Sequence, residues 1–234
     1  MTGARILLAT GNAHKVAEIQ AILGAGWQVE ARDPEVEETG ATFEENALIK
    51  ARALARASGE LAIADDSGIE IEALGGAPGV HSARWTDEGD WIPRVLRELD
   101  GAGPAGRRCR YVCAAAAVWP DLPADGPAGP AGQGAGGAGS GASSAGGVGA
   151  AGPGAGGGGG SGASSVGTGE VAVRGTVDGV VADAPRGTGG FGYDPIMVPV
   201  EGDGRTFAEM SEAEKHALSH RGRAFRLLAP HLST

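Results

Sequence analysis

Two adjacent carboxylates, Asp65 and Asp66, lie in the apolar stretch AIADDSGIEI and are followed by Ser67 and Gly68. We expect a short buried strand to end at Ala64 and Gly68 to permit a turn before a second strand. Neighbouring carboxylates repel each other, so such a pair usually receives a counter-charge, a metal ion or water. The pair is a candidate for acid–base or metal chemistry, and a solvated turn is the alternative because Asp and Ser are common there.

The segment TGNAHK, residues 10–15, lies where a predicted strand passes into a predicted helix. Backbone amides at a helix N-terminus attract anions, Gly11 lets a phosphate approach closely, and Lys15 supplies a positive charge. The segment lacks the glycine spacing and the Lys-Ser/Thr pair of a Walker loop. It predicts an anion site, with an ordinary capped turn as the alternative.

Two further carboxylates, Glu44 and Glu45, open a predicted helix that begins at Thr42. Thr42 and Glu45 have the spacing of a capping box, so capping alone accounts for Glu45 and solvation for Glu44. Mg²⁺ is usually held by one or two carboxylates together with water and substrate phosphates. A glutamate from this helix and an aspartate from the 65–66 pair, converging beside a phosphate loop, would form such a site.

The loop GTGGFGYDP, residues 187–195, combines glycines, two aromatic residues and one carboxylate. Phe191 and Tyr193 offer flat apolar faces on which a nucleobase can stack, and Asp194 can accept a hydrogen bond from a ring N–H. The alternative is a tight loop with both aromatic rings packed into the core.

The segment SEAEKHALSHRG, residues 211–222, predicts a capped helix that ends near Ser219 and His220. Arg221 offers a rigid fork of donors for a carbonyl or phosphate, and Lys215 offers a mobile point charge. Each residue alone is typical of a protein surface. Together with a stacking loop and a metal site, they predict a pocket for a nucleoside triphosphate.

Alternating strands and helices position these motifs, which predicts a mixed α/β fold. We expect strands at residues 5–9, 27–31 and 108–119, a strand pair around AIADDSGIEIEAL, and a hairpin over 169–181. We expect helices at residues 15–23, 42–57 and 91–99, and two short helices over 211–228 that are broken near His220.

Glycine is unusually abundant, with 44 of 234 residues, and it is concentrated between Asp121 and Thr168. That segment is almost entirely Gly, Ala, Ser and Pro, so it cannot bury enough apolar area to offset the entropy lost on ordering. We therefore expect one domain over residues 1–234, interrupted by a flexible Gly/Ala/Ser-rich insertion at 121–168.

The formal net charge of −10 argues against a protein that binds nucleic acid through broad phosphate contacts. The apolar run near the N-terminus is too short to span a membrane, which predicts a cytoplasmic protein. Cys109 and Cys113 share one face of a predicted strand and have no second pair to complete a metal site, so we expect buried, reduced thiols.

Five motifs in order, TGNAHK, TFEENALIKA, ADDSGIEIEALGGAPGVHSARW, GTGGFGYDP and EKHALSHRG, resemble the inosine triphosphatase family, the Ham1-like non-canonical purine nucleoside triphosphate pyrophosphatases. The resemblance covers the chain outside residues 121–168. It implies an elongated, two-lobed, mixed-sheet α/β fold with the active cleft between the lobes. It also implies a Mg²⁺-dependent homodimer that hydrolyses ITP, dITP and XTP to the monophosphate and pyrophosphate.

The resemblance also implies roles for individual residues. Asp66 and Lys15 are expected to be catalytic, Glu45 and Asp66 to bind Mg²⁺, and Asp65 to support Asp66. The expected substrate-binding residues are Thr10, Gly11, Asn12, Lys15, Ser67, Phe191, Gly192, Tyr193, Asp194, Lys215, His220 and Arg221.

We expect Asp66 to act as general base for water attacking the α-phosphorus, while Mg²⁺ and Lys15 neutralise charge on the phosphate oxygens. Donors such as His220 and Arg221 would recognise the 6-oxo group of hypoxanthine or xanthine and disfavour adenine. Two alternatives remain open. One is a pyrophosphatase for pyrimidine or modified nucleotides, and the other is a nucleotide-binding sensor without turnover.

Overall fold

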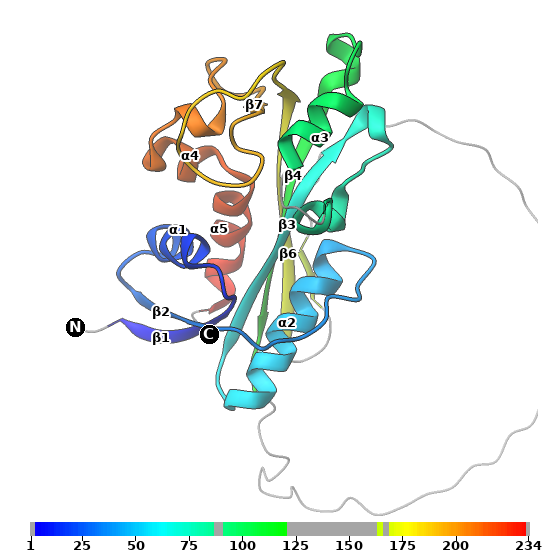
Figure 1. Cartoon of the computed structure of the whole chain (residues 1–234). Helices are drawn as coiled ribbons and strands as arrows, with labels where there is room; N and C mark the ends of the chain where they lie inside the picture. The colour runs from blue at the N-terminus through cyan, green and yellow to red at the C-terminus, as the bar shows by residue number, and fades with distance from the viewer. Residues whose placement is uncertain (1–2, 87–90, 121–162, 166–168, 233–234) are drawn as a thin grey trace, which may run out of the picture. The chain divides into compact units, whose positions relative to one another are not determined.

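The computed structural model describes residues 3–86, 91–120, 163–165 and 169–232. Helices cover both faces of a mixed β-sheet, which confirms the predicted mixed α/β class (Figure 1). The strands are β1 (Ala4–Ala9), β2 (Trp27–Arg32), β3 (Ala62–Ile71), β4 (Arg108–Val118), β5 (Ala163–Ser165), β6 (Glu170–Val181) and β7 (Met197–Pro199). The α-helices are α1 (Ala13–Leu23), α2 (Phe43–Ser58), α3 (Trp91–Glu98), α4 (Glu212–Leu218) and α5 (His220–Leu232). Short 3₁₀ helices are η1 (Glu72–Leu74), η2 (Gly79–Arg84), η3 (Pro104–Arg107) and η4 (Phe207–Glu209).

The sheet has the strand order β2-β1-β3-β4-β6-β5, and β7 also pairs with β6. Strand β1 is parallel to β2 and β3, whereas the other pairs are antiparallel. Strands β1 and β3 pair at Leu7↔Ala62 and Leu8↔Ile63, but β3 continues beside β4 as far as Ile71. The second half of β3 therefore extends beyond its pairing with β1, near the carboxyl end of β1, where α/β sheets commonly bind ligands.

Both faces of the sheet are buried. Figure 1 shows α2 on one face and α1 with α5 on the other. Leu7 of β1 packs with Phe43 of α2, whereas Ile6 packs with Ile19 of α1 and Phe225 of α5. Alternate residues of a strand point to opposite faces, so β1 reads as a continuous apolar run. The four consecutive alanines at 114–117 of β4 are fully buried and let helices approach closely on both sides.

The predicted turn at Gly68 is wrong, because β3 runs without interruption from Ala62 to Ile71. A Cβ atom on Gly68 would lie 2.5 Å from the carbonyl oxygen of Gly79 and 3.0 Å from Cε1 of Phe43. The glycine is needed because η2 and α2 approach the strand closely, not because the chain turns. Asp65 and Asp66 consequently lie inside a strand rather than at its end.

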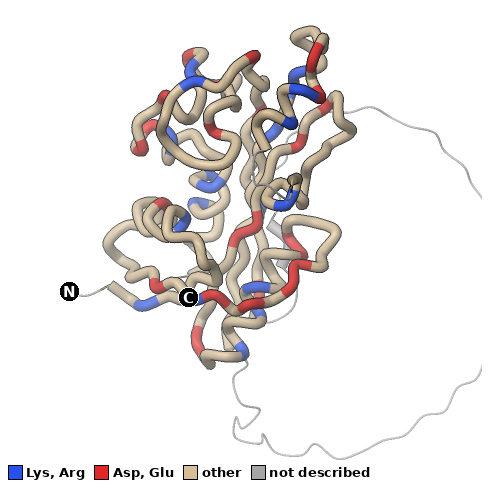
Figure 2. The backbone as a smooth tube through the Cα atoms, viewed as in Figure 1, with Lys and Arg blue, Asp and Glu red and all other residues tan. Residues whose placement is uncertain are grey.

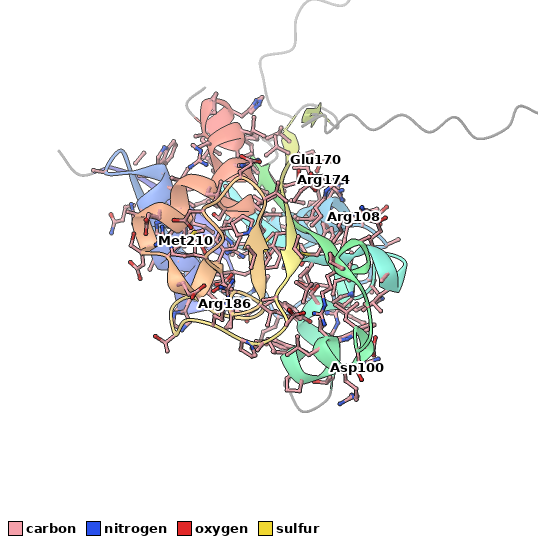
Figure 3. The ribbon with its side chains drawn as sticks, turned by 90° about the horizontal axis from the view of Figure 1, so that it is seen from above. Asp100, Arg108, Glu170, Arg174, Arg186 and Met210 are labelled. Atoms are coloured by element: carbon pink, nitrogen blue, oxygen red, sulfur yellow. The ribbon has the colours of Figure 1, made fainter. Side chains whose placement is uncertain are left out.

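The predicted hairpin over residues 169–181 is also wrong, because β6 is one strand that pairs with β4 along its whole length. Figure 3 views the sheet from above and labels Glu170 and Arg174 on this strand. A Cβ atom on Gly175 would lie 2.9 Å from Cβ of Arg223, so the missing side chain lets α5 pack against the sheet. Glycine inside a strand often marks such a close approach.

Several other predictions are confirmed. Thr42 and Glu45 form the capping box of α2, and α4 and α5 are separated at Ser219. Helix α3 contains Pro93 in its first turn, where proline is tolerated. Cys109 and Cys113 are buried and free.

Most of the predicted insertion at 121–168 lies outside the described residues, but residues 163–165 within it form β5 and pair with β6. Within the described ranges, none of the helices has the length and apolarity needed to cross a membrane.

Candidate functional site

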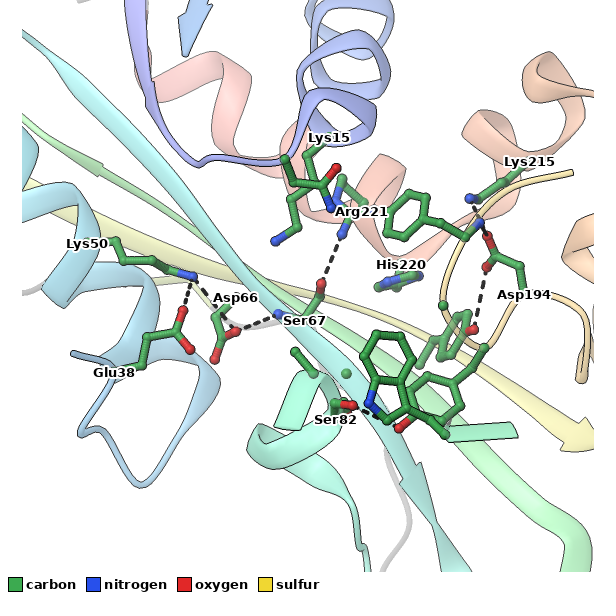
Figure 4. Close-up of a pocket in the computed structure, with 18 residues that line it drawn as sticks. Lys15, Glu38, Lys50, Asp66, Ser67, Ser82, Asp194, Lys215, His220 and Arg221 are labelled. Carbon is green, nitrogen blue, oxygen red and sulfur yellow. Dashed lines mark hydrogen bonds and ion pairs between the residues drawn. The ribbon is translucent and has the colours of Figure 1, made fainter. Parts of the chain in front are cut away.

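A pocket lies over the second half of β3 (Figure 4). It brings together residues from β3, from the start of α1, from α2 and the segment before it, from the 191–194 loop, and from α4 and α5. Eleven of the expected site residues line it: Asn12, Lys15, Asp66, Ser67, Phe191, Gly192, Tyr193, Asp194, Lys215, His220 and Arg221. Residues far apart in the sequence thus meet where β3 extends beyond β1.

The carboxylates of Asp65 and Asp66 project to opposite faces of the sheet, because successive side chains of a strand alternate. Asp65 contacts residues of α1 and α5, whereas Asp66 contacts residues of α2. The strand thereby separates two charges that are adjacent in sequence. Each carboxylate has its own set of partners and its own electrostatic environment.

Asp65 is the centre of a buried ion-pair network. Its Oδ1 lies 3.0 Å from Lys15 Nζ, and its Oδ2 lies 3.2 Å from Arg221 Nε. Arg221 Nη1 also donates to Glu18 Oε2 at 2.6 Å. Burial opposes ionisation of Asp65, but the charges of Lys15 and Arg221 outweigh it and hold the pKa of Asp65 well below its usual range. Asp65 is therefore a fixed anion that orients two cations.

Asp66 has a different environment. Its Oδ2 accepts a hydrogen bond of 3.0 Å from Asn46 Nδ2, and its Oδ1 accepts one of 3.0 Å from the backbone N–H of Ser67. Burial raises the pKa of Asp66, and the opposing effects of Lys50 and Asn46 are smaller. A carboxylate with a raised pKa inside a pocket is suited to accept a proton.

Lys50 and Glu38 also line the pocket, and the sequence analysis missed both. Lys50 Nζ lies 2.6 Å from Glu38 Oε1 and 3.9 Å from Asp66 Oδ1. Burial alone would lower the pKa of Lys50, but the surrounding carboxylates more than offset this and raise it, so the ammonium remains charged. The available signal was the spacing of Asn46 and Lys50, which places two polar residues one helical turn apart.

The remaining lining residues, also absent from the predicted set, are Gly68, Ser82, Ala83, Trp91 and Tyr111. Tyr193 donates its hydroxyl hydrogen to the carbonyl of Ser82 at 2.8 Å and stacks against Trp91. Tyr193 and Trp91 form an aromatic part of the pocket lining. No motif pointed to Trp91 or Tyr111, because their place in the pocket depends on how α3 and β4 pack.

Four cations and three carboxylates line the pocket of a chain whose net charge is −10. Figure 2 shows acidic positions along the middle of β3 and before α2, with basic positions on the facing helices. The pocket is thus locally more positive than the protein as a whole, as an anionic ligand requires.

Asp194 anchors the loop that carries Phe191. It is almost completely buried, and its Oδ2 accepts hydrogen bonds from the backbone N–H of Phe191 at 2.8 Å and from Lys215 Nζ at 2.6 Å. Gly190 precedes the aromatic residue with a φ of 69° and leaves no room for a side chain beside Asp194. Both the turn and the carboxylate therefore determine where the Phe191 backbone lies.

Arg221 and His220 differ in their remaining hydrogen-bonding capacity. Four hydrogen bonds from Arg221 to Glu18, Asp65 and Ser67 leave one of its five N–H groups. Burial, followed by the charges of Arg221 and Lys215, lowers the pKa of His220 well below its usual value. Its Nδ1 is buried without a partner among the described residues, so a neutral imidazole can still bond to a ligand.

Three expected site residues, Thr10, Gly11 and Glu45, do not line the pocket. Thr10 Oγ1 accepts from the backbone N–H of Asn12 at 3.1 Å, which shapes the turn into α1. A Cβ atom on Gly11 would lie 2.7 Å from Asp33 Oδ2, so the approach seen there is that of a carboxylate. Glu45 Oε2 accepts from the backbone N–H of Ala41 at 2.6 Å as part of its cap.

The pocket offers two carboxylates to a metal ion, Glu38 and Asp66, on either side of Lys50 Nζ. In the described parts of the chain, no group of three or more His, Cys, Asp or Glu side chains is arranged to hold a metal. Two carboxylates are sufficient for Mg²⁺ when phosphate oxygens and water complete its shell. The donor set therefore fits a metal that binds together with its substrate.

Comparisons with known proteins agree with this arrangement. The sequence model of the Ham1 family matches residues 6–130 and 162–231. The chain belongs to the Ham1 family. Two relatives named dITP/XTP pyrophosphatase align with this chain over nearly the full length of both proteins. The relative from Streptomyces avermitilis is 39% identical, covering 97% of this chain and 96% of its own, and that from Symbiobacterium thermophilum is 42% identical, covering 96% and 92%.

Solved structures of Ham1 proteins have the same fold. A HAM1 protein from Coxiella burnetii superposes with a TM-score of 0.69 and 32% identity over 98% of both chains. A nucleoside-triphosphatase, dITP/XTP pyrophosphatase, from Mycobacterium abscessus gives a TM-score of 0.61 and 34% identity over 99% of this chain and 100% of that chain. Family membership thus rests on both sequence and fold.

The two neighbouring aspartates should differ in their effect on stability. In Asp65→Asn, we expect the free energy of unfolding at pH 7 to fall by about 3–5 kcal/mol, because buried cations lose their counter-charge. In Asp66→Asn, we expect little loss or a gain, because burial disfavours its charge. Urea unfolding of both metal-free variants measures this difference.

The Asp65→Asn deficit also has a predicted pH dependence. The pKa of Asp65 is lower in the folded state than its ordinary value of 3.8, so its stabilisation is complete above that value and is lost as the pH falls below it. The deficit should therefore shrink below pH 3.8. Equal destabilisation by the two substitutions at pH 7 would contradict the separation of the two carboxylates.

Proposed function

We propose that this chain hydrolyses the non-canonical purine nucleoside triphosphates ITP, dITP and XTP to the monophosphate and pyrophosphate, which removes deaminated purines from the nucleotide pool. The names of its relatives support this reaction. The observation that carries it is the placement of Asp66, a proton acceptor with a raised pKa, in a pocket that also holds cations and aromatic rings.

In the proposed reaction, Asp66 takes a proton from a water molecule that attacks the α-phosphorus, and pyrophosphate leaves. Lys15 and Lys50 are held near Asp65 and Asp66, and both ammonium groups neutralise charge that develops on phosphate oxygens. Asn12, at the turn into α1, and Ser67 line the pocket and bind and orient the phosphate chain.

The aromatic part of the pocket receives the purine. Phe191 provides the stacking face, while Tyr193 and Trp91 form the adjacent wall. His220, kept neutral by burial, hydrogen-bonds the base, and the remaining N–H of Arg221 is a further donor to the 6-oxo group. Adenine presents an amino group at that position and would leave a buried donor unpaired, which disfavours ATP.

We further propose Mg²⁺ as the cofactor, held by Asp66 and by a glutamate together with substrate phosphates. When bound, this ion would neutralise phosphate charge and polarise the reacting groups. Glu38 is the better second ligand because it lines the pocket, whereas the Glu45 carboxylate caps α2.

Pyrophosphate release tests the proposed reaction. With Mg²⁺ present, the wild type should release pyrophosphate from ITP, dITP and XTP far faster than from ATP or dTTP, because only the former match the base site. Asp66→Asn should lower kcat by about 10²–10⁴-fold with the fold intact, since it removes the general base. Release mainly from dTTP would favour the pyrimidine alternative. ITP binding without turnover in the wild type would favour a sensor.

Metal affinity distinguishes the two glutamates. Glu38→Gln should raise the Mg²⁺ concentration needed for half-maximal activity by about tenfold or more, because one carboxylate of the site is neutralised. Glu45→Gln should leave that concentration unchanged and lower the free energy of unfolding by about 0.5–2 kcal/mol through the weakened cap. The reverse pattern would assign the metal to Glu45, as the sequence analysis expected.

We also propose a homodimer that works in the cytoplasm, where its nucleotide substrates are made; the family resemblance is the support for the dimer. Light scattering coupled to size-exclusion chromatography should give twice the chain mass of 23.1 kDa. A mass that stays at 23.1 kDa across micromolar concentrations would exclude a stable dimer.

A further inference from the structure

The imidazole of His14 stacks on the ring of Phe191, with ring centroids 5.9 Å apart and an interplanar angle of 23°. Phe191 lines the pocket, whereas His14 is exposed and does not line it. His14 therefore contacts the ring without itself lining the pocket. Resting on the proposed function, we propose that His14 is a positioning residue that holds the Phe191 ring in place for the purine.

His14 is itself held by the turn that precedes α1. Its backbone N–H donates to Asn12 Oδ1 at 2.9 Å, so the N-cap of the helix fixes the point from which the imidazole projects. Lys15, the next residue, is anchored to Asp65. His14, which stacks on the Phe191 ring, thus belongs to the same turn as Lys15, the lysine that we propose binds phosphate.

The backbone of Phe191 is fixed, but its ring is only half-buried. Lys215 Nζ lies 4.7 Å and Arg221 Cζ 5.4 Å from the ring centroid, so both cations can interact with the aromatic face. Among the described residues, the ring that stacks on Phe191 is that of His14, and a contact between nearly parallel rings favours one orientation of the ring plane.

A ring held in its bound orientation loses less freedom when a base stacks on it, so the effect should appear in binding. In His14→Ala, we expect KM for ITP to rise by about 3- to 10-fold, the size of one stacking contact, with kcat within about twofold. His14→Phe should restore KM because it retains a flat ring. Binding of inorganic pyrophosphate, which has no base, should be unchanged in both variants.

The experiment combines steady-state kinetics with calorimetric titration of IMP and pyrophosphate. His14→Ala is compared with wild type and in a Phe191→Ala background, where its effect on KM and on IMP affinity should disappear because the partner ring is gone. His81→Ala, an exposed histidine on η2, is the matched control and should behave as wild type.

Unchanged KM and IMP affinity in His14→Ala would overturn the proposal, as would an effect that persists in the Phe191→Ala background. Weaker pyrophosphate binding would instead assign His14 to the phosphate turn and also overturn it. If the wild type releases no pyrophosphate from ITP, the proposed reaction fails, but the IMP titrations still decide the role of His14. If the wild type releases pyrophosphate but binds no IMP, the KM values for ITP in the two backgrounds decide the role of His14; if it neither releases pyrophosphate nor binds IMP, both proposals fail.

Discussion

The site depends on one constraint, the alternation of side chains along β3. Because Asp65 and Asp66 are successive residues of a strand, their carboxylates lie on opposite faces of the sheet and meet different partners. Asp65 is neutralised by Lys15 and Arg221 and remains an anion, whereas burial raises the pKa of Asp66. From two identical residues, one strand thus provides a carboxylate that is held as an anion and a carboxylate with a raised pKa.

The buried network around Asp65 also joins elements that are distant in sequence. It connects α1 through Lys15 and Glu18 to α5 through Arg221, and both helices pack on the same face of β3. On the other face, Asn46 and Lys50 of α2 approach Asp66. The partners of Asp65 and those of Asp66 both lie where β3 continues beyond its pairing with β1. The pocket therefore follows from the unequal lengths of these two strands.

In the 187–195 loop, Asp194 is a buried packing residue and Phe191 faces the pocket. Asp194, which looked from its sequence like a group for the base, is buried beneath Phe191 and binds Lys215. Phe191 itself remains half-exposed at the pocket, where Lys215, Arg221 and the imidazole of His14 contact its ring. The backbone position of Phe191 therefore depends on the buried ion pair of Asp194 and Lys215.

The sequence by itself determined the α/β class, most helix and strand positions, and the motifs that meet in the pocket, because hydrophobic periodicity and capping signals are local. It predicted a turn at Gly68 and a hairpin over 169–181, since a glycine required for close packing, such as Gly68 or Gly175, looks the same in sequence as one required for a turn. It also missed Glu38, Lys50 and Trp91, because no local pattern records which surfaces face each other. Only the tertiary structure shows which carboxylate is neutralised, which glutamate faces the pocket and which ring stacks on Phe191, because each depends on contacts between distant segments.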